Sequence, residues 1–231
     1  MDELEGSVSK DGTKEDEKHI RDLAFLSMTS MGFLELSPED DIYEFIAEQL
    51  KKLSGDSFIV VSSFDEATDY AYCREVLGVG EKMGIIISIL GKHPVGMSLK
   101  IDNEAKLGLT SGKLVKVPNG FYEFCYRKIP RTVCRTIEKV LDLGDIYAMG
   151  FAWKGNLFGN ASILTRKGTP LADQTVIETF IHQASVALQR RQVEQALQKA
   201  HDELETRVEE RTRELAEANA QMFVEMTERK N

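Results

Sequence analysis

The sequence lacks the features of nucleic-acid-binding, secreted and membrane-spanning proteins. Its 231 residues carry a formal net charge of −9 and no run of lysines and arginines, so the basic surface that attracts phosphate backbones is missing. The first residues are acidic and do not lead into the apolar core of a signal peptide, and no stretch of about 18 apolar residues could span a bilayer. We therefore expect a cytoplasmic protein that binds neither nucleic acid nor a membrane.

Cysteine is scarce as well. Cys73, Cys125 and Cys134 are an odd number of thiols without CxxC or CxxCH spacing, which argues against a disulfide framework, structural zinc and c-type haem attachment. Cys125 and Cys134 flank Pro130, so a loop could bring their sulfur atoms together. We expect these two thiols to be reduced in the cytosol, and they could pair under oxidation.

Catalytic signatures are missing too. The sequence has no GxxxxGK[ST], GxSxG or HExxH motif and no cluster of paired carboxylates. A histidine kinase needs a phospho-accepting histidine followed closely by proline, together with a separate ATP-binding domain, and neither fits in this chain. We expect the chain itself to be non-catalytic, although it could be part of a histidine kinase.

Composition divides the chain into three segments. Residues 1–17 contain almost no large apolar side chains, which predicts a disordered acidic tail. Residues 18–190 have the apolar content of one folded domain, and residues 191–231 are rich in charged residues with a helical apolar spacing.

Within the domain, apolar periodicity and turn residues predict alternating helices and strands. One helix has Ser37 as its N-cap and Pro38 in its first turn, and another is ended by Gly144. The expected helices cover 18–31, 37–54, 82–90 and 131–143, with one short helix in 102–120, and the expected strands cover 57–64, 70–79, 97–101, 146–153 and 157–165. This order predicts an α+β fold, an antiparallel sheet with helices on its faces.

The last helix carries the strongest periodic signal. From Thr175 onward, Ile177, Phe180, Ile181 and Leu188 form a stripe broad enough to pack on a sheet. Beyond Arg191 the apolar spacing changes to a 4-3-4 pattern that repeats every 11 residues, at 193, 197, 200, 204, 208, 211, 215, 219, 222 and 226.

An 11-residue repeat predicts a coiled coil that is nearly straight or slightly right-handed. We expect its seam to join two parallel copies of the chain, because an unpaired helix of this length would expose a continuous apolar stripe. The seam positions are Val193, Leu197, Leu204, Val208 and Leu215. A solvated single helix is the alternative.

Four segments resemble a known family. They are GDSFIVVSSF, GKHPVGMSLKID, YEFCYRKIPRTVCRTIEKVL, and LFGNASILTRKG followed by IETFIHQASVALQRRQVEQAL. Together they are similar to a GAF domain of the kind found in multi-domain sensor histidine kinases of methanogenic archaea, over roughly residues 20–197. The following LETRVEERTRELAEANAQM looks like a helical connector that leads into a further sensor or kinase domain.

The resemblance implies an antiparallel sheet of about six strands. It also implies a ligand pocket roofed by short helices on one face, and dimer contacts of the first and last helices on the other. Some relatives bind haem, through a histidine axial ligand and in some cases a cysteine thioether. On that basis the candidate cofactor-binding residues are Cys134, His182 and His93, with His182 as the iron ligand.

The residues themselves do not settle the haem question. Cys134 is also explained as a small buried side chain on the apolar side of its helix. His182 lies about 170° from the sheet-facing stripe of the last helix by the 100° rule, which argues against its reaching a pocket across the sheet.

Four functions remain open from the sequence. The leading one is a sensory and dimerisation module that binds a small ligand or redox cofactor and relays its state through the C-terminal helix. The others are a haem-based redox or gas sensor, a ligand-free dimeric spacer, and a GAF-type methionine sulfoxide reductase. The cysteines lack the clustering expected of the reductase.

Overall fold

The computed structural model describes residues 3–171 and 173–228, and the side chains of residues 16–171, 173–220 and 222. The chain divides into two compact units, Met1–Gln189 and Arg190–Asn231. The first unit contains all the strands, and the second contains the later part of the last helix. No helix in the described ranges is long and apolar enough to cross a membrane.

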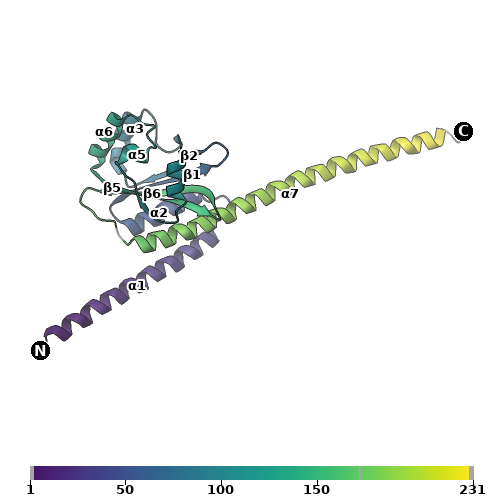
Figure 1. Cartoon of the computed structure of the whole chain (residues 1–231). Helices are drawn as coiled ribbons and strands as arrows, with labels where there is room; N and C mark the ends of the chain where they lie inside the picture. The colour runs from purple at the N-terminus through teal and green to yellow at the C-terminus, as the bar shows by residue number, and fades with distance from the viewer. Residues whose placement is uncertain (1–2, 172, 229–231) are drawn as a thin grey trace. The chain divides into compact units, whose positions relative to one another are not determined.

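The first unit is an α+β domain built on one six-stranded antiparallel sheet, shown in Figure 1. The strand order is β3-β2-β1-β6-β5-β4. The strands are β1 Ser57–Asp65, β2 Tyr70–Leu77, β3 Ser98–Lys100, β4 Val115–Lys116, β5 Leu143–Trp153 and β6 Asn156–Arg166. The helices are α1 Glu3–Glu35, α2 Ile42–Ser54, η1 Gly80–Lys82, α3 Met83–Leu90, α4 Asn103–Leu109, α5 Phe121–Phe124, α6 Arg131–Leu141 and α7 Gln174–Glu228.

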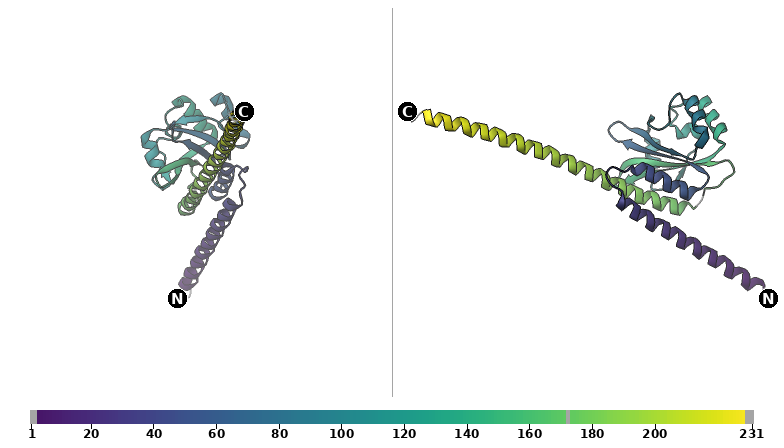
Figure 2. Two further views of the ribbon diagram at one scale, coloured as in Figure 1. Left: turned by 90° about the vertical axis from the view of Figure 1, so that its right-hand side faces the viewer. Right: turned by 180° about the vertical axis from the view of Figure 1, so that it is seen from behind.

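Alternating side chains on the central strand β1 divide the core into two layers. Ile59 and Val61 point to one face, where they join a buried cluster with α2 and the start of α7. Phe58 and Val60 point to the other face, toward α3, α5 and α6. Figure 2 shows these two groups of helices on opposite sides of the sheet. The period-2 alternation of β1 therefore separates a packed helical layer from the layer that contains the cavities described below.

Aromatic side chains attach α1 to the first of these layers. The ring centroids of Phe25 and Phe33 lie 6.0 and 5.7 Å from that of Phe180 on α7. At the other end of the contact, Lys18 pairs with Asp173 at 2.6 Å. The helix extends from this packed region back to Glu3, so residues 3–17 are helical where the sequence predicted a disordered tail. Once a helix is nucleated, each further residue adds a backbone hydrogen bond, so extending it is much less costly than starting it.

Two predicted helix ends lie elsewhere. Ser37 is not an N-cap: α2 begins at Ile42, and the Asp41 carboxylate accepts hydrogen bonds from the Tyr43 and Glu44 N–H groups at 2.8 and 3.4 Å. Asp41 caps because its extended backbone leads directly into the first helical turn.

Gly144 does not end α6. That helix ends at Leu141, its C-cap Asp142 is in the left-handed conformation, and Gly144 already belongs to β5. A Cβ at Gly144 would lie 2.6 Å from the Arg166 carbonyl oxygen, so this glycine permits a close approach of two strands rather than a helix end.

Gly159 provides a sharper test of strand packing. A Cβ at Gly159 would collide with the Ser62 carbonyl oxygen of β1, which belongs to the backbone and cannot move aside alone. We expect Gly159→Ala to destabilise the domain by about 1–3 kcal/mol, because β1 and β6 must separate locally. Gly84→Ala is the matched control: nothing lies within 4 Å of its Cβ, and removing a helical glycine should stabilise by about 0.5–1 kcal/mol. Urea unfolding would measure the change in unfolding free energy of both variants. Equal changes would contradict a close contact between Gly159 and β1.

Candidate functional site

An apolar cavity of about 110 Å³ lies between the sheet and the roof formed by α3, α5 and α6. Phe58 and Leu164 from the sheet and Met83, Ile86 and Ile137 from the roof are among the side chains around it. None of its described lining residues is charged. This is the position that the sequence resemblance implied for a ligand pocket.

Hydrogen bonds between the roof elements hold this layer together. The Phe121 N–H at the start of α5 donates to Glu138 of α6 at 2.8 Å. Lys82, beside α3, donates to the Val140 carbonyl oxygen of α6 at 2.8 Å. The roof of the cavity is thus formed by three short helices that are tied to one another.

A second cavity, of about 240 Å³, lies beside the first, between α4, β4 and the turn after α5. Its rim carries charged groups, and Arg127 pairs with Glu123 at 2.7 Å, with Glu104 at 3.4 Å and with Asp102 at 3.8 Å. Tyr126 lines both cavities. The two spaces are therefore neighbours that share one aromatic side chain.

Cys134 lies on α6 and is almost fully buried, with its Sγ 3.6 Å from the Ile129 carbonyl oxygen. Its neighbour is Cys125, and the thiol hydrogen bond between them, together with burial, raises the pKa of Cys125. The structure thus brings these two cysteines together, as the spacing around Pro130 suggested. Cys125 lines the apolar cavity, and Cys134, on the roof helix α6, is not among the described lining residues. Their oxidation to a disulfide stays a prediction.

The two candidate histidines lie away from Cys134. His182 is an exposed residue of α7, and its ring approaches the Gly112 loop. The neighbouring Ile181 packs against the sheet face opposite the cavity. His93 is exposed in the loop after α3, where its Nδ1 accepts the Val95 N–H at 3.1 Å. Neither histidine is among the described residues that line the apolar cavity.

The cavity and its surroundings do not fit haem. A space of about 110 Å³ is comparable to cavities that admit a single aromatic ring, about 150 Å³ for benzene, and is far smaller than a porphyrin requires. The candidate axial ligand His182 lies on the α7 side of the sheet, whereas Cys134 lies on the α6 side. The described side chains also contain no group of three or more His, Cys, Asp or Glu residues that could hold a metal ion.

Sequence reasoning missed the polar residues on the cavity floor. Cys73, Ser62 and Asn160 occupy directly paired positions on β2, β1 and β6 and all line the cavity. Burial, followed by the Glu75 charge, raises the pKa of the Cys73 thiol to about 12, so this cysteine is held as a neutral thiol. The available signal was the strand period: Ser62 and Asn160 lie on the same faces of their strands as the apolar Val60 and Leu164.

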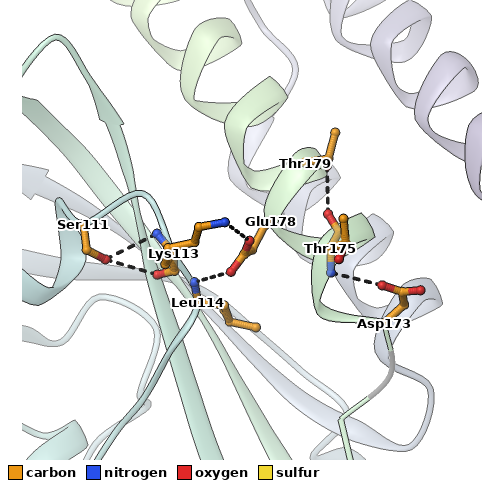
Figure 3. Close-up of polar contacts among 7 residues, drawn as sticks. All are labelled: Ser111, Lys113, Leu114, Asp173, Thr175, Glu178 and Thr179. Carbon is orange, nitrogen blue, oxygen red and sulfur yellow. Dashed lines mark hydrogen bonds and ion pairs between the residues drawn. The ribbon is translucent and has the colours of Figure 1, made fainter.

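Glu178 on α7 connects the helix to the loop between α4 and β4, as Figure 3 shows. Its carboxylate accepts the Leu114 N–H at 2.9 Å and the Lys113 ammonium at 3.0 Å. Partial burial opposes ionisation of Glu178, but these hydrogen bonds outweigh it and hold its pKa below the ordinary value of 4.5. Through this contact a loop that borders the second cavity is attached to α7.

The predicted seam residues all lie in the second unit. Val193, Leu197, Leu204, Val208 and Leu215 are more than half exposed on α7, between 55% and 69%. The helix is therefore formed as predicted. The pairing of two such helices stays a prediction, because a single chain leaves this stripe uncovered.

Solved structures with a similar fold include GAF domains. The chain matches the GAF domain of a phosphoenolpyruvate-protein phosphotransferase from Coxiella burnetii with a TM-score of 0.55 at 11% identity, over 77% of this chain and 98% of that one. It matches the corresponding Acinetobacter domain with a TM-score of 0.50 at 10% identity, over 74% and 94%. It also matches the chromophore-binding domain of Stigmatella aurantiaca phytochrome P1, with a TM-score of 0.51 at 11% identity, over 73% and 59%.

The first unit therefore has a GAF-like fold, which confirms the fold class predicted from the sequence. No family model matches the chain, and neither does any curated protein. At identities near 10% the structural matches establish the fold, and the function has to be argued from the site itself.

The Glu178 contact generates a testable prediction. The Glu178 side chain is 16% exposed and that of Lys113 is 74% exposed. We expect Glu178→Ala to destabilise the domain by about 1–3 kcal/mol, because the partly buried Leu114 N–H loses its acceptor. Lys113→Ala removes only an exposed ion pair and should cost less than about 1 kcal/mol. Urea unfolding at neutral pH would measure both.

The pH dependence follows from the lowered pKa of Glu178. A carboxyl group whose pKa is lower in the folded state stabilises the fold above its unfolded-state pKa, here 4.5, and loses that contribution as the pH falls through the folded-state value. The difference in stability between the wild-type chain and Glu178→Gln should therefore shrink below about pH 4.5. A constant difference across that range would contradict the role of the ionised carboxylate.

Proposed function

We propose that the chain is a sensory and dimerisation module of a signal-transduction protein of the sensor histidine kinase type. It binds a small ligand in the apolar cavity and relays the bound state through α7. The observation that carries this proposal is the cavity itself, a space of about 110 Å³ with no charged residue among its described lining, between the sheet and three short helices. The role is one of binding rather than catalysis, in the cytoplasm, ahead of a downstream domain.

Two features support a relay. The roof helix α6 and the turn after α5 border the cavities, and the loop that follows α4 is attached to α7 by Glu178. Ligand entry that shifts α4 or the turn after α5 would change the strain on this attachment. A ligand can shift such an equilibrium only by binding one arrangement more tightly than the other.

The output is proposed to be a homodimer formed by the N- and C-terminal helices. The outer side of α1 exposes Ile20, Leu23, Met31 and Leu34, each at least 55% accessible. The later part of α7 exposes the seam described above. Apolar stripes on helices of this length favour pairing with an identical stripe, since a second copy presents the same 11-residue repeat.

The ligand-binding part of the proposal can be tested with toluene as a probe. We expect toluene to bind the wild-type chain and to raise its melting temperature, because ligands that bind only the folded state stabilise it. Ala71→Leu places a larger side chain in the cavity from β2 and should abolish this shift. Ala67→Leu, at an exposed turn position, is the control that should keep it.

Differential scanning fluorimetry with and without toluene gives the readout. A wild-type chain that neither toluene, at its solubility limit, nor phenol stabilises would remove the ligand-binding role. The module would then be better described as a dimeric spacer.

The dimer part is tested by Leu204→Glu. If the seam pairs two copies, this change buries an unpaired charge in each facing helix and should weaken the dimer at least about 100-fold. Sedimentation equilibrium should show a shift from dimer to monomer, while circular dichroism retains the signal of the folded domain. The exposed Glu205→Lys is the control that should dimerise normally. A wild-type monomer at tens of micromolar would rule out the coil as the output element.

A further inference from the structure

Two oxygen atoms on the floor of the apolar cavity have no hydrogen-bond partner in the described part of the chain. Ser62 and Asn160 are paired residues of β1 and β6 and are only 8% and 3% exposed. The Asn160 Nδ2 donates to Ser162 at 3.1 Å, but its Oδ1 accepts nothing, and the Ser62 hydroxyl neither donates nor accepts. Among the described residues, every side-chain oxygen or nitrogen without a hydrogen-bond partner has some accessible surface. These two oxygens are therefore accessible, and the space beside them is the cavity that both residues line.

Such an arrangement is costly unless something occupies the cavity. A polar group inside a protein that is paired neither by the protein nor by a molecule in the cavity destabilises the fold relative to a paired one. The surrounding lining side chains are mainly aliphatic and aromatic, so an apolar side chain at either position would pack without this penalty. A ligand that hydrogen-bonds to both residues would remove the penalty, and one that is merely apolar would not.

Tyr126 offers a third polar group from the roof side. Its side chain lines the same cavity, and its hydroxyl makes no hydrogen bond to any residue that the structure describes. The backbone of Tyr126 and Arg127 is left-handed, with φ of 50° and 61°, which is uncommon for residues other than glycine. The turn is held by the Tyr126 N–H to Glu123 at 2.8 Å and by the Arg127 side chain to Glu123 at 2.7 Å.

A strained turn that is fixed by several contacts is typical of a segment that positions a side chain for binding. Tyr126 therefore lines the cavity from a fixed point in the roof. Ser62 and Asn160 reach it from a rigid sheet.

From these observations we infer that the cavity selects a neutral, mainly apolar molecule about the size of one aromatic ring that carries a hydrogen-bond donor. The Asn160 Oδ1 accepts a hydrogen bond from the ligand's donor, and Ser62 and Tyr126 supply hydroxyl groups that donate or accept hydrogen bonds. The absence of charged groups among the lining residues disfavours phosphates and carboxylates, whose burial without a counter-charge is expensive. This inference rests on the proposed ligand-binding function and specifies the ligand class.

The experiment compares phenol with toluene, which have similar size and shape and differ in one hydroxyl donor. Isothermal titration of each probe into the full 231-residue chain gives a phenol-to-toluene affinity ratio. We expect the wild-type ratio to be at least about 10, the effect of one or two buried neutral hydrogen bonds. We use the ratio because a variant that merely loosens the cavity lowers the affinities for phenol and toluene alike and leaves their ratio unchanged.

Three variants each remove one polar group. Asn160→Leu, similar in size, should reduce the ratio about 10-fold, and Ser62→Ala and Tyr126→Phe about 3-fold each. Tyr72→Phe is the matched control, because Tyr72 lines neither cavity, and it should leave the ratio unchanged. Circular dichroism verifies that each variant is folded, and Tyr126→Phe and Ser62→Ala keep the test valid if Asn160→Leu unfolds.

The outcomes separate this inference from the proposed function. Equal binding of phenol and toluene would overturn polar selection and leave the apolar ligand site in place. A preference for phenol that survives all three variants would also overturn it, because the hydroxyl would be recognised elsewhere. If neither probe binds, the ligand-binding function fails and the inference fails with it. A ratio that falls in the three variants and not in Tyr72→Phe supports the inference.

Discussion

The pairing of β1 with β6 is the constraint on which the rest of the domain depends. These strands are joined in register from Ser57 with Thr165 to Ser63 with Gly159, and they form the centre of the sheet. Because each strand alternates its side chains, this one register fixes two surfaces at once. One closes against α2 and α7, and the other carries Ser62 and Asn160 beneath the cavity. A slip of one residue would exchange the two surfaces and remove both core and site.

The two faces differ in how completely they are filled. The α7 side contains large fully buried side chains such as Phe151 and Phe180, with aromatic rings from α1 packed against them. The opposite side is covered by short helices linked through individual hydrogen bonds, and it retains two cavities. Short helices have few tertiary contacts to stabilise them, so local opening is cheaper there than on the α7 side. A ligand could therefore change the positions of the short helices on the cavity side while the packing on the α7 side is unchanged.

Most of the fold was predictable from the sequence, and most of the candidate site was not. Strong local patterns located β1, β6 and the packed part of α7, because runs of apolar residues with a clear period reflect which face is buried. The helix ends at Ser37 and Gly144 were misplaced, since alternative caps and close strand approaches depend on tertiary contacts that local sequence does not contain. Asn160 and Tyr126 were overlooked for a related reason. Their interest lies in side-chain oxygens without hydrogen-bond partners, and only the three-dimensional structure shows which neighbours a side chain has.

The apolar spacing along the later part of α7 also fixes the direction in which its apolar stripe points around the helix axis. Each residue advances an α-helix by about 100° and 1.5 Å, so 11 residues return the stripe to nearly the same direction after about three turns. Removing one residue between Val193 and Leu215 would turn the remainder of the stripe by more than a quarter of a circle, whereas removing a whole repeat would scarcely turn it. Insertions or deletions in this segment therefore keep the direction of its apolar stripe only if they comprise whole 11-residue repeats.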